Sequence, residues 1–192
     1  MSAENKLFPV FLKISKLNTL IVGGGNVGLE KLNALLKNDP EAKVTLVGRR
    51  ISDAIKKRIK GSAVKIHERP FVEEDLDNIQ VLILATDDRR THEDIYSLAS
   101  ARGILTNVAD TPDLCDFYLG STVTKGHLKI GISTNGQSPT FAKRFRQVLE
   151  DILPDETNDL IKNLNEIRNS LKVSFAEKVK ILNDQTKALL GN

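Results

Sequence analysis

The chain has 192 residues, of which 40% are hydrophobic and 28% charged, and it carries a formal net charge of +3 at pH 7. This composition is typical of a folded globular protein and excludes a disordered one, and no apolar run reaches the roughly 18 to 20 residues that cross a bilayer. The positive charge is too small to indicate nucleic-acid binding, and the single cysteine, Cys115, has no internal disulfide partner. We therefore expect a cytoplasmic protein with neither a membrane nor a nucleic-acid partner.

The first part of the chain alternates short apolar strands with helices. The pattern predicts strands at residues 19–22, 44–47, 64–67, 81–85 and 104–108. It predicts helices at residues 27–36, 52–60 and 90–102, and we expect His92, in the third of these, on the surface. Such alternation is typical of a parallel sheet with crossover helices, so we predict an α/β, Rossmann-like domain over residues 1–112.

The pattern changes after residue 112. Residues 117–123 and 128–133 predict an antiparallel hairpin, and Ser138-Pro139 marks the start of an amphipathic helix, which together form a segment over residues 113–150. Two further amphipathic helices predict an α-helical C-terminal region over residues 151–192, the second beginning at a capping box from Ser174 to Glu177. Single-sided apolar helices in a small chain need a partner surface, which either a second subunit or the same chain supplies.

A glycine loop follows the first strand. The motif Gly23-x-Gly25-x-x-Gly28 lies between an apolar strand and a helix, which is the context of the dinucleotide-binding fingerprint. The first glycine permits a tight turn, the second permits close approach of a pyrophosphate, and the third permits helix–strand packing. The sequence therefore predicts dinucleotide binding.

The end of the second strand bears on which dinucleotide is bound. The acidic residue that usually holds the adenosine ribose is missing, and Gly48-Arg49-Arg50 stands there instead. Arginine at this place pairs with a ribose 2′-phosphate, although backbone contacts to the ribose or two solvated arginines are alternatives. Thr86, after the fourth strand, either contacts the cofactor or caps the next helix.

Four segments in order resemble the precorrin-2 dehydrogenase family, which is the dehydrogenase module of sirohaem synthase. They are LFPVFLKISKLNTLIVGGGNVGLEKLNALL, ILATDDRRTHEDI, GILTNVADTPDLCDF and LKIGISTNGQSPTFAKRFRQVLE, and the resemblance covers about residues 6–155. The resemblance implies NAD-dependent oxidation of precorrin-2 to sirohydrochlorin by a homodimer that interlocks through the segment after the Rossmann domain. Some members of the family also insert iron, and the sequence leaves open whether this chain does.

The resemblance also assigns residues to roles. The cofactor contacts fall on the glycine loop and two other strand ends: Gly23, Gly24, Gly25, Asn26, Val27, Gly28, Arg49, Arg50 and Thr86. The aspartate of the N-V-x-D motif falls on Asp110, as a base or as a holder of the macrocycle nitrogens, with capping of the following turn as the structural alternative. The substrate side falls on the polar loop: Ser133, Thr134, Asn135, Gly136 and Ser138. Arg144, with Lys143 and Arg146 in the helix after this loop, is a cation that suits the carboxylates of precorrin-2, with a solvated helix face as the alternative. Arg49-Arg50 departs from the family pattern and leaves NADP open beside NAD, and Thr134 replaces a serine that some members phosphorylate.

Two other classes of protein compete with this interpretation. A non-catalytic NAD(P)-binding sensor accounts for the glycine loop but not for the N-V-A-D and S-T-N-G-Q-S-P segments. A short-chain dehydrogenase needs a Tyr-x-x-x-Lys pair, and neither Tyr96 nor Tyr118 has a lysine four residues later. The chain also lacks the H-x-x-x-H and C-x-x-C spacings of metal sites, so we expect no resident metal.

Overall fold

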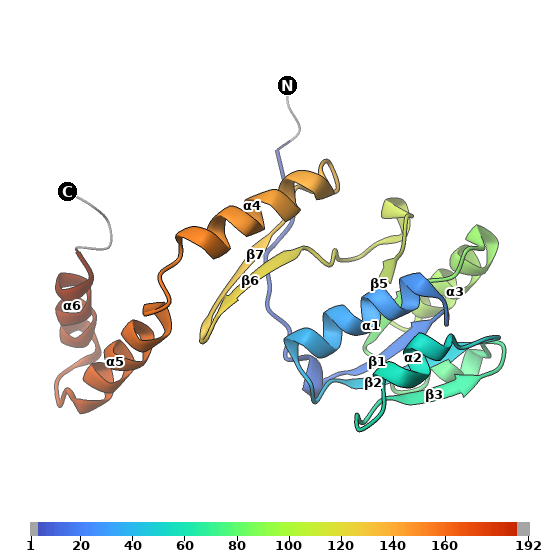
Figure 1. The fold of residues 1–192 in the computed structure, drawn as a ribbon, viewed down its shortest axis with the longest axis horizontal. Coiled ribbons are helices and arrows are strands. Elements are labelled where there is room, and N and C mark those ends of the chain that lie inside the picture. The colour runs from blue at the N-terminus through green and yellow to red at the C-terminus, as the bar shows by residue number, and fades with distance from the viewer. Residues whose placement is uncertain (1–3, 188–192) are drawn as a thin grey trace. The chain divides into compact units, whose positions relative to one another are not determined.

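The computed structural model describes residues 4–187, which form two compact units (Figure 1). One unit comprises Lys6–Leu119, and the other comprises the described residues from Gly120 onward together with residues 4 and 5. Each unit is described by itself below.

A five-stranded parallel sheet forms the centre of the first unit. Its strands are β1 (Asn18–Val22), β2 (Lys43–Gly48), β3 (Lys65–Glu68), β4 (Val81–Leu84) and β5 (Leu105–Val108), in the spatial order β3-β2-β1-β4-β5. All four pairings are parallel, and the register places Val22 beside both Val47 and Leu84. This is the strand order of a mononucleotide-binding Rossmann half with two neighbouring strands, so the predicted α/β class is confirmed.

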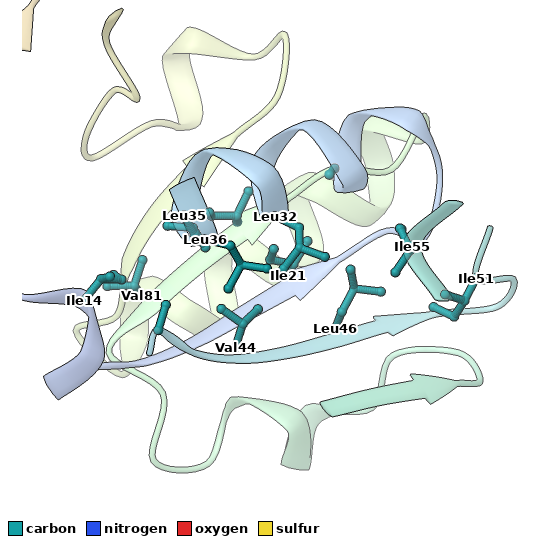
Figure 2. Close-up of a cluster of buried hydrophobic side chains, with 13 residues drawn as sticks. Ile14, Ile21, Leu32, Leu35, Leu36, Val44, Leu46, Ile51, Ile55 and Val81 are labelled. Atoms are coloured by element: carbon teal, nitrogen blue, oxygen red, sulfur yellow. The ribbon is translucent and has the colours of Figure 1, made fainter. Parts of the chain in front are cut away.

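Helices cover both faces of this sheet because its central strands are apolar on both sides. On one face, α1 (Asn26–Asn38) and α2 (Asp53–Arg58) pack on the sheet; Figure 2 shows Leu32 of α1 and Ile55 of α2 beside Ile21 and Leu46. On the other face, α3 (Arg89–Ala101) and the 3₁₀ turn η2 (Glu73–Leu76) cover alternate strand residues such as Leu20. Leu20 and Ile21 are adjacent and both fully buried, which requires this double covering.

The second unit is built on a hairpin. Strands β6 (Ser121–Lys125) and β7 (Leu128–Ile132) pair antiparallel, and α4 (Pro139–Ile152) packs against β6. Two more helices, α5 (Thr157–Ser170) and α6 (Phe175–Thr186), follow and contact each other. At the hairpin tip, Lys125 forms an ion pair with Asp155 (2.6 Å) and the His127 amide donates to the Asn158 side chain (2.9 Å), which fixes the start of α5 against the turn.

The predicted elements are present, and most of their ends shift by one or two residues. The first strand of the hairpin is the exception, because it is predicted at residues 117–123 and is observed at Ser121–Lys125. The predicted caps are also confirmed: Ser138 Oγ accepts from the Phe141 amide at the start of α4, and Ser174 and Glu177 form a reciprocal capping box on α6. The 3₁₀ turns η1 (Ile14–Lys16), η2 and η3 (Pro112–Leu114) were not predicted, because each is shorter than a period of the hydrophobic pattern. None of the helices within residues 4–187 has the length and apolar character needed to span a membrane.

Candidate functional site

The carboxyl ends of four strands form one edge of the parallel sheet. Backbone hydrogen bonds continue one residue past the strands: Gly23 N donates to Val47 O (2.8 Å), Ala85 N to Val22 O (2.8 Å) and Ala109 N to Leu84 O (2.9 Å). The order β3-β2-β1-β4-β5 changes direction between β1 and β4, which is the topological switch point where open α/β sheets bind ligands. The glycine loop leaves β1 and Thr86 leaves β4 at this point.

The first and third glycines of the loop are required by packing. Gly23 has φ +129°, and a Cβ there would overlap the Ala85 carbonyl. A Cβ on Gly28 would overlap the Gly23 carbonyl. The helix α1 therefore lies so close to the loop that only glycine fits at position 28. These two residues therefore serve the fold, as the fingerprint predicts.

The middle glycines differ from each other. A Cβ on Gly24 would overlap the Arg50 carbonyl, which belongs to the loop after β2. By contrast, apart from Gly25 itself and its chain neighbours, no atom of the described residues lies within 4 Å of a Cβ built on Gly25, which precedes the first turn of α1. The open space beside Gly25 and the free amides at the start of a 13-residue helix fit a pyrophosphate. The residues present thus fit a nicotinamide dinucleotide.

An open cavity of about 500 Å³ adjoins this loop. Its lining residues come from the glycine loop, the loop after β2, the start of α2 and the end of β3: Gly24, Gly25, Arg50, Ile51, Ser52, Asp53 and Glu68. Glu68 accepts hydrogen bonds from the Ile51 amide (3.0 Å) and from Lys56 Nζ (2.8 Å). The Lys56 bond, followed by the Ile51 amide, lowers the pKa of Glu68, so this carboxylate is ionised and engaged at neutral pH.

The two arginines after β2 are exposed. Arg50 lines the cavity, whereas Arg49 lies beside it in the chain. Within residues 4–187 neither guanidinium takes part in an ion pair. Both side chains are therefore free to bind an anion.

Thr86 and His92 lie together at the end of β4. Thr86 Oγ1 is 2.8 Å from His92 Nε2, and His92 is 4% exposed, so the prediction of a surface histidine is wrong. The helix α3 turns His92 inward because His92, Ile95 and Ala99 share its buried face. This spacing is visible in the sequence, but the charged neighbours of His92 hide it. The cap of α3 is Asp88, not Thr86.

The protonation of His92 determines whether the Thr86 hydroxyl can donate a hydrogen bond to a ligand. Burial is the main cause that lowers the pKa of His92, so the ring is neutral. Its Nδ1 is buried with no hydrogen-bond partner among the described residues. The tautomer that avoids a buried, unpaired N–H carries its proton on Nε2 and donates it to Thr86. The Thr86 hydroxyl proton then remains available for a ligand at the sheet edge.

Asp110 follows β5 at the same edge. It is exposed and adopts φ +55°, a left-handed conformation that is uncommon outside glycine, asparagine and aspartate. No hydrogen bond or ion pair holds its carboxylate among the residues that the structure describes. The predicted alternative, capping of the following turn, is therefore not observed.

The thiol of Cys115 supports the loop that carries Asp110. Its Sγ accepts from the Val108 amide (3.2 Å), and the Val108 carbonyl (3.2 Å) and the Thr111 carbonyl (3.5 Å) both lie within reach of its single thiol proton. Burial raises the pKa of the Cys115 thiol, so the group stays protonated and has a structural role. From the sequence, Cys115 indicates only a reducing, cytoplasmic location, and its structural role has no signal in the sequence.

The residues expected on the substrate side lie in the second unit. The loop between β7 and α4 is folded by its own side chains: Asn135 N donates to Ser133 Oγ (3.2 Å) and Ser138 N to Thr134 Oγ1 (3.1 Å). Asn135 and Gly136 both have positive φ, at 52° and 76°. These contacts define the loop shape and leave the Asn135 side chain exposed.

The basic residues after this loop differ in their partners. Arg146 forms an ion pair with Glu150 (2.8 Å), whereas Arg144 is exposed and forms no ion pair in the described part of the chain. Arg144 is thus the cation of this pair that remains free. Within residues 4–187 no group of three or more potential metal ligands is gathered.

Comparison with known proteins identifies the first unit. Residues 10–121 match a family model described as "Putative NAD(P)-binding", which covers more than half of the chain. The chain belongs to this NAD(P)-binding family. Residues 125–152 of this NAD(P)-binding protein match a second model, the central part of sirohaem biosynthesis proteins. Both matches agree with the resemblance that the four sequence motifs carry.

Curated relatives of the NAD(P)-binding chain are sirohaem synthases. The chain is 35% identical over 168 residues to the enzyme from Psychrobacter arcticus and 33% identical over 168 residues to that from Pseudoalteromonas atlantica. Each match covers 88% of this chain but only 30% and 36% of the relative. The chain thus spans about a third of the length of the curated relatives that it matches.

A solved structure has the same fold as this NAD(P)-binding chain. It is SirC, a precorrin-2 dehydrogenase, with a TM-score of 0.72 and 23% identity over 93% of this chain and 88% of that chain. At this identity the likeness supports the fold: the parallel sheet, the hairpin and the C-terminal helices.

Proposed function

We propose that the chain is a precorrin-2 dehydrogenase, which oxidises precorrin-2 to sirohydrochlorin with a nicotinamide dinucleotide. Three findings support the proposal: the NAD(P)-binding family match, the sirohaem biosynthesis match over residues 125–152, and the sirohaem synthase relatives. A sensor without catalysis is the less economical alternative, because it gives no reason for an unpaired carboxylate at the nucleotide edge of the sheet.

The single observation that carries the proposal is the state of Asp110. Its carboxylate follows β5, at the same edge as the glycine loop, and has no partner among the described residues. Its left-handed backbone conformation costs free energy. Such conformations are found most often at functional sites, where the surrounding structure maintains them. An exposed, unpaired carboxyl group at this edge suits removal of a proton from the substrate.

The roles of the protein residues follow from this arrangement. The bound nicotinamide supplies the hydride acceptor. The amides after Gly25 hold the pyrophosphate, and the hydroxyl of Thr86 donates toward the nucleotide. Asp110 accepts the proton that leaves when the macrocycle is oxidised, or fixes the macrocycle through its pyrrole N–H groups.

The substrate carries eight carboxylates, and it needs basic and polar partners. Ser133, Asn135 and the free guanidinium of Arg144 supply such groups in the second unit, and we propose them as substrate contacts. Thr134 and Ser138 shape the loop that presents them.

We further propose that the enzyme is a cytoplasmic homodimer. Four large side chains on one face of α4 are exposed, namely Phe141, Phe145, Val148 and Ile152. The rings of Phe141 and Phe145 stack with their centroids 5.7 Å apart, so they form one continuous apolar surface. The spacing of this face suits a second copy of the same helix. The protonated, structural thiol of Cys115 is consistent with a reducing compartment.

Anaerobic turnover tests the activity. The purified chain is incubated with precorrin-2 and either NAD⁺ or NADP⁺, and absorbance is recorded for both the reduced nucleotide and the tetrapyrrole. We expect the reduced nucleotide and the oxidised tetrapyrrole to form together, with one nucleotide reduced for each precorrin-2 oxidised. Nucleotide binding without any change in the tetrapyrrole spectrum would support the sensor instead. Addition of Fe²⁺ or Co²⁺ afterwards tests whether the product is also metallated.

A further inference from the structure

The end of β2 has no room for the acidic side chain that usually accepts hydrogen bonds from the adenosine ribose of NAD. In dinucleotide-binding folds an acidic side chain at this place holds the ribose hydroxyls of NAD. Here the place is Gly48, and a Cβ on Gly48 would lie 2.9 Å from Gly24 N and 3.3 Å from Arg50 O. Any side chain at position 48 would displace the glycine loop. The strand therefore has no carboxylate to offer.

Two cations take the place of that carboxylate. Arg50 lines the open cavity together with Gly24 and Gly25, and Arg49 precedes it. The backbone of this loop is fixed, because Ser52 N donates to Gly24 O (2.9 Å) and the Arg50 carbonyl packs on Gly24. The two guanidinium groups are exposed and form no ion pair in the described part of the chain. Free guanidinium groups bind phosphate through charge-assisted, bidentate hydrogen bonds.

The cavity also has two acids, which have to be weighed against the arginines. Both oxygens of Glu68 are engaged, one by the Ile51 amide and one by Lys56, so Glu68 supports the loop and its charge is balanced. Asp53, the first residue of α2, is exposed and is the remaining acid among the residues that line the cavity. The unpaired charges that line the cavity are thus those of Arg50 and Asp53, and Arg49 adds a second exposed cation next to Arg50 in the chain.

We infer that Arg49 and Arg50 form a binding site for the 2′-phosphate of NADP, so that the chain binds NADP more tightly than NAD. The inference rests on the nucleotide site of the proposed function and specifies its ligand. A 2′-phosphate brings close to two negative charges and three acceptor oxygens to a cavity lined by the unpaired guanidinium of Arg50, with the exposed Arg49 next to it in the chain. Charge-assisted hydrogen bonds of this kind change affinity by about 10- to 100-fold.

Equilibrium binding tests the inference without turnover. Dissociation constants of the full chain for NADP⁺, NAD⁺, 2′,5′-ADP and 5′-AMP are measured by titration calorimetry in the absence of tetrapyrrole. We expect NADP⁺ to bind about 10-fold or more tightly than NAD⁺, and 2′,5′-ADP to exceed 5′-AMP by a similar factor. The preference decreases at high salt because it is electrostatic.

Substitutions locate the preference. Arg50→Ala, and more fully the double variant Arg49→Ala/Arg50→Ala, should bring the NADP⁺ to NAD⁺ affinity ratio close to one by weakening NADP⁺ alone. The matched control is Lys60→Ala, which removes one exposed positive charge beyond the end of α2 and should leave the ratio unchanged. Melting temperatures of all variants establish that each remains folded.

Asp53→Asn separates the inference from its rival. If the arginines hold a 2′-phosphate, this change leaves NADP⁺ affinity equal or higher. A tenfold loss of NAD⁺ affinity in Asp53→Asn would instead make Asp53 the ribose acceptor and overturn the inference. Equal affinities for the two nucleotides, unchanged in the double variant, would also overturn it while leaving the dehydrogenase proposal intact. A chain that binds neither nucleotide would refute the dehydrogenase proposal itself.

Discussion

Thr86 Oγ1 and His92 Nε2 lie 2.8 Å apart, and this contact joins the ligand edge of the sheet to the buried face of α3. The ring is neutral because its burial lowers the pKa of His92. Removal of the ring therefore affects both the stability of the first unit and the orientation of a hydroxyl at the nucleotide edge.

The pH dependence of stability tests this contact. In the unfolded chain the pKa of a histidine is about 6.5, and in the folded chain it is lower, so the unfolded state binds more protons below about pH 6.5. The contribution is fully present above that value and is lost as the pH falls toward the folded pKa. Urea unfolding from pH 8 to pH 5 should show a loss of at most about 1.4 kcal/mol per pH unit from this group. His92→Phe should reduce the slope, whereas the same slope in His92→Phe as in the parent chain would contradict the assignment. His67→Phe, at an exposed histidine of the same unit, is the control.

The glycines of the loop should separate binding from folding. Gly25→Ala introduces a Cβ into open space, so we expect a near-normal melting temperature and a loss of nucleotide affinity of tenfold or more. Gly28→Ala introduces a Cβ that overlaps the Gly23 carbonyl, so we expect a large loss of stability. Circular dichroism melts and nucleotide titration distinguish the two effects. Equal loss of stability in both variants would refute the role assigned to Gly25.

Asp110 should be needed for turnover and not for nucleotide binding. Asp110→Asn keeps the shape of the side chain and a residue that tolerates positive φ, and it removes the negative charge. We expect kcat to decrease by about 100-fold or more, in the range of general acid–base catalysis. Nucleotide affinity and melting temperature should stay unchanged. Full turnover in Asp110→Asn would contradict a role as base.

Arg144 should act on the tetrapyrrole side. Reversal of this free cation in Arg144→Glu should raise the KM for precorrin-2 more than the KM for the nucleotide, because the substrate is a polyanion. Lys60→Glu changes the net charge equally at an exposed place in the first unit and serves as the control. Steady-state kinetics with each substrate varied in turn measure the split. Equal increases in both constants, or the same effect in the control, would argue against a substrate contact.

The exposed face of α4 should hold two copies together. Phe145→Glu places a charge in the centre of this face, and we expect the mass in solution to fall from twice the chain mass of 21.3 kDa to that mass. Lys143→Glu, on the opposite side of the helix, is the control. Light scattering coupled to gel filtration gives both masses. A parent chain that is already monomeric would refute the dimer.

Most strands of the sheet can be predicted from the sequence, because the pattern of apolar residues that defines each strand lies within a few consecutive positions. Strands such as residues 19–22 are continuous apolar runs, and the glycine loop has a fixed spacing relative to the strand before it. The buried position of His92 escaped prediction because its polarity and its charged neighbours outweighed a weak i, i+3, i+7 pattern. The engagement of Glu68 by Lys56 also escaped, because a contact between β3 and α2 depends on tertiary packing and has no local signature.

The contact between Gly48 and Gly24 has an evolutionary consequence. A lineage that starts from this backbone cannot acquire an aspartate at the end of β2 by one mutation, because the glycine loop already occupies the space the side chain needs. A change of nucleotide preference has to proceed through positions 49 and 50 or through Asp53, and of these residues Arg50 and Asp53 line the open cavity. Under selection for a different coenzyme we would therefore expect the glycines to stay the same and the substitutions to occur at positions 49, 50 and 53.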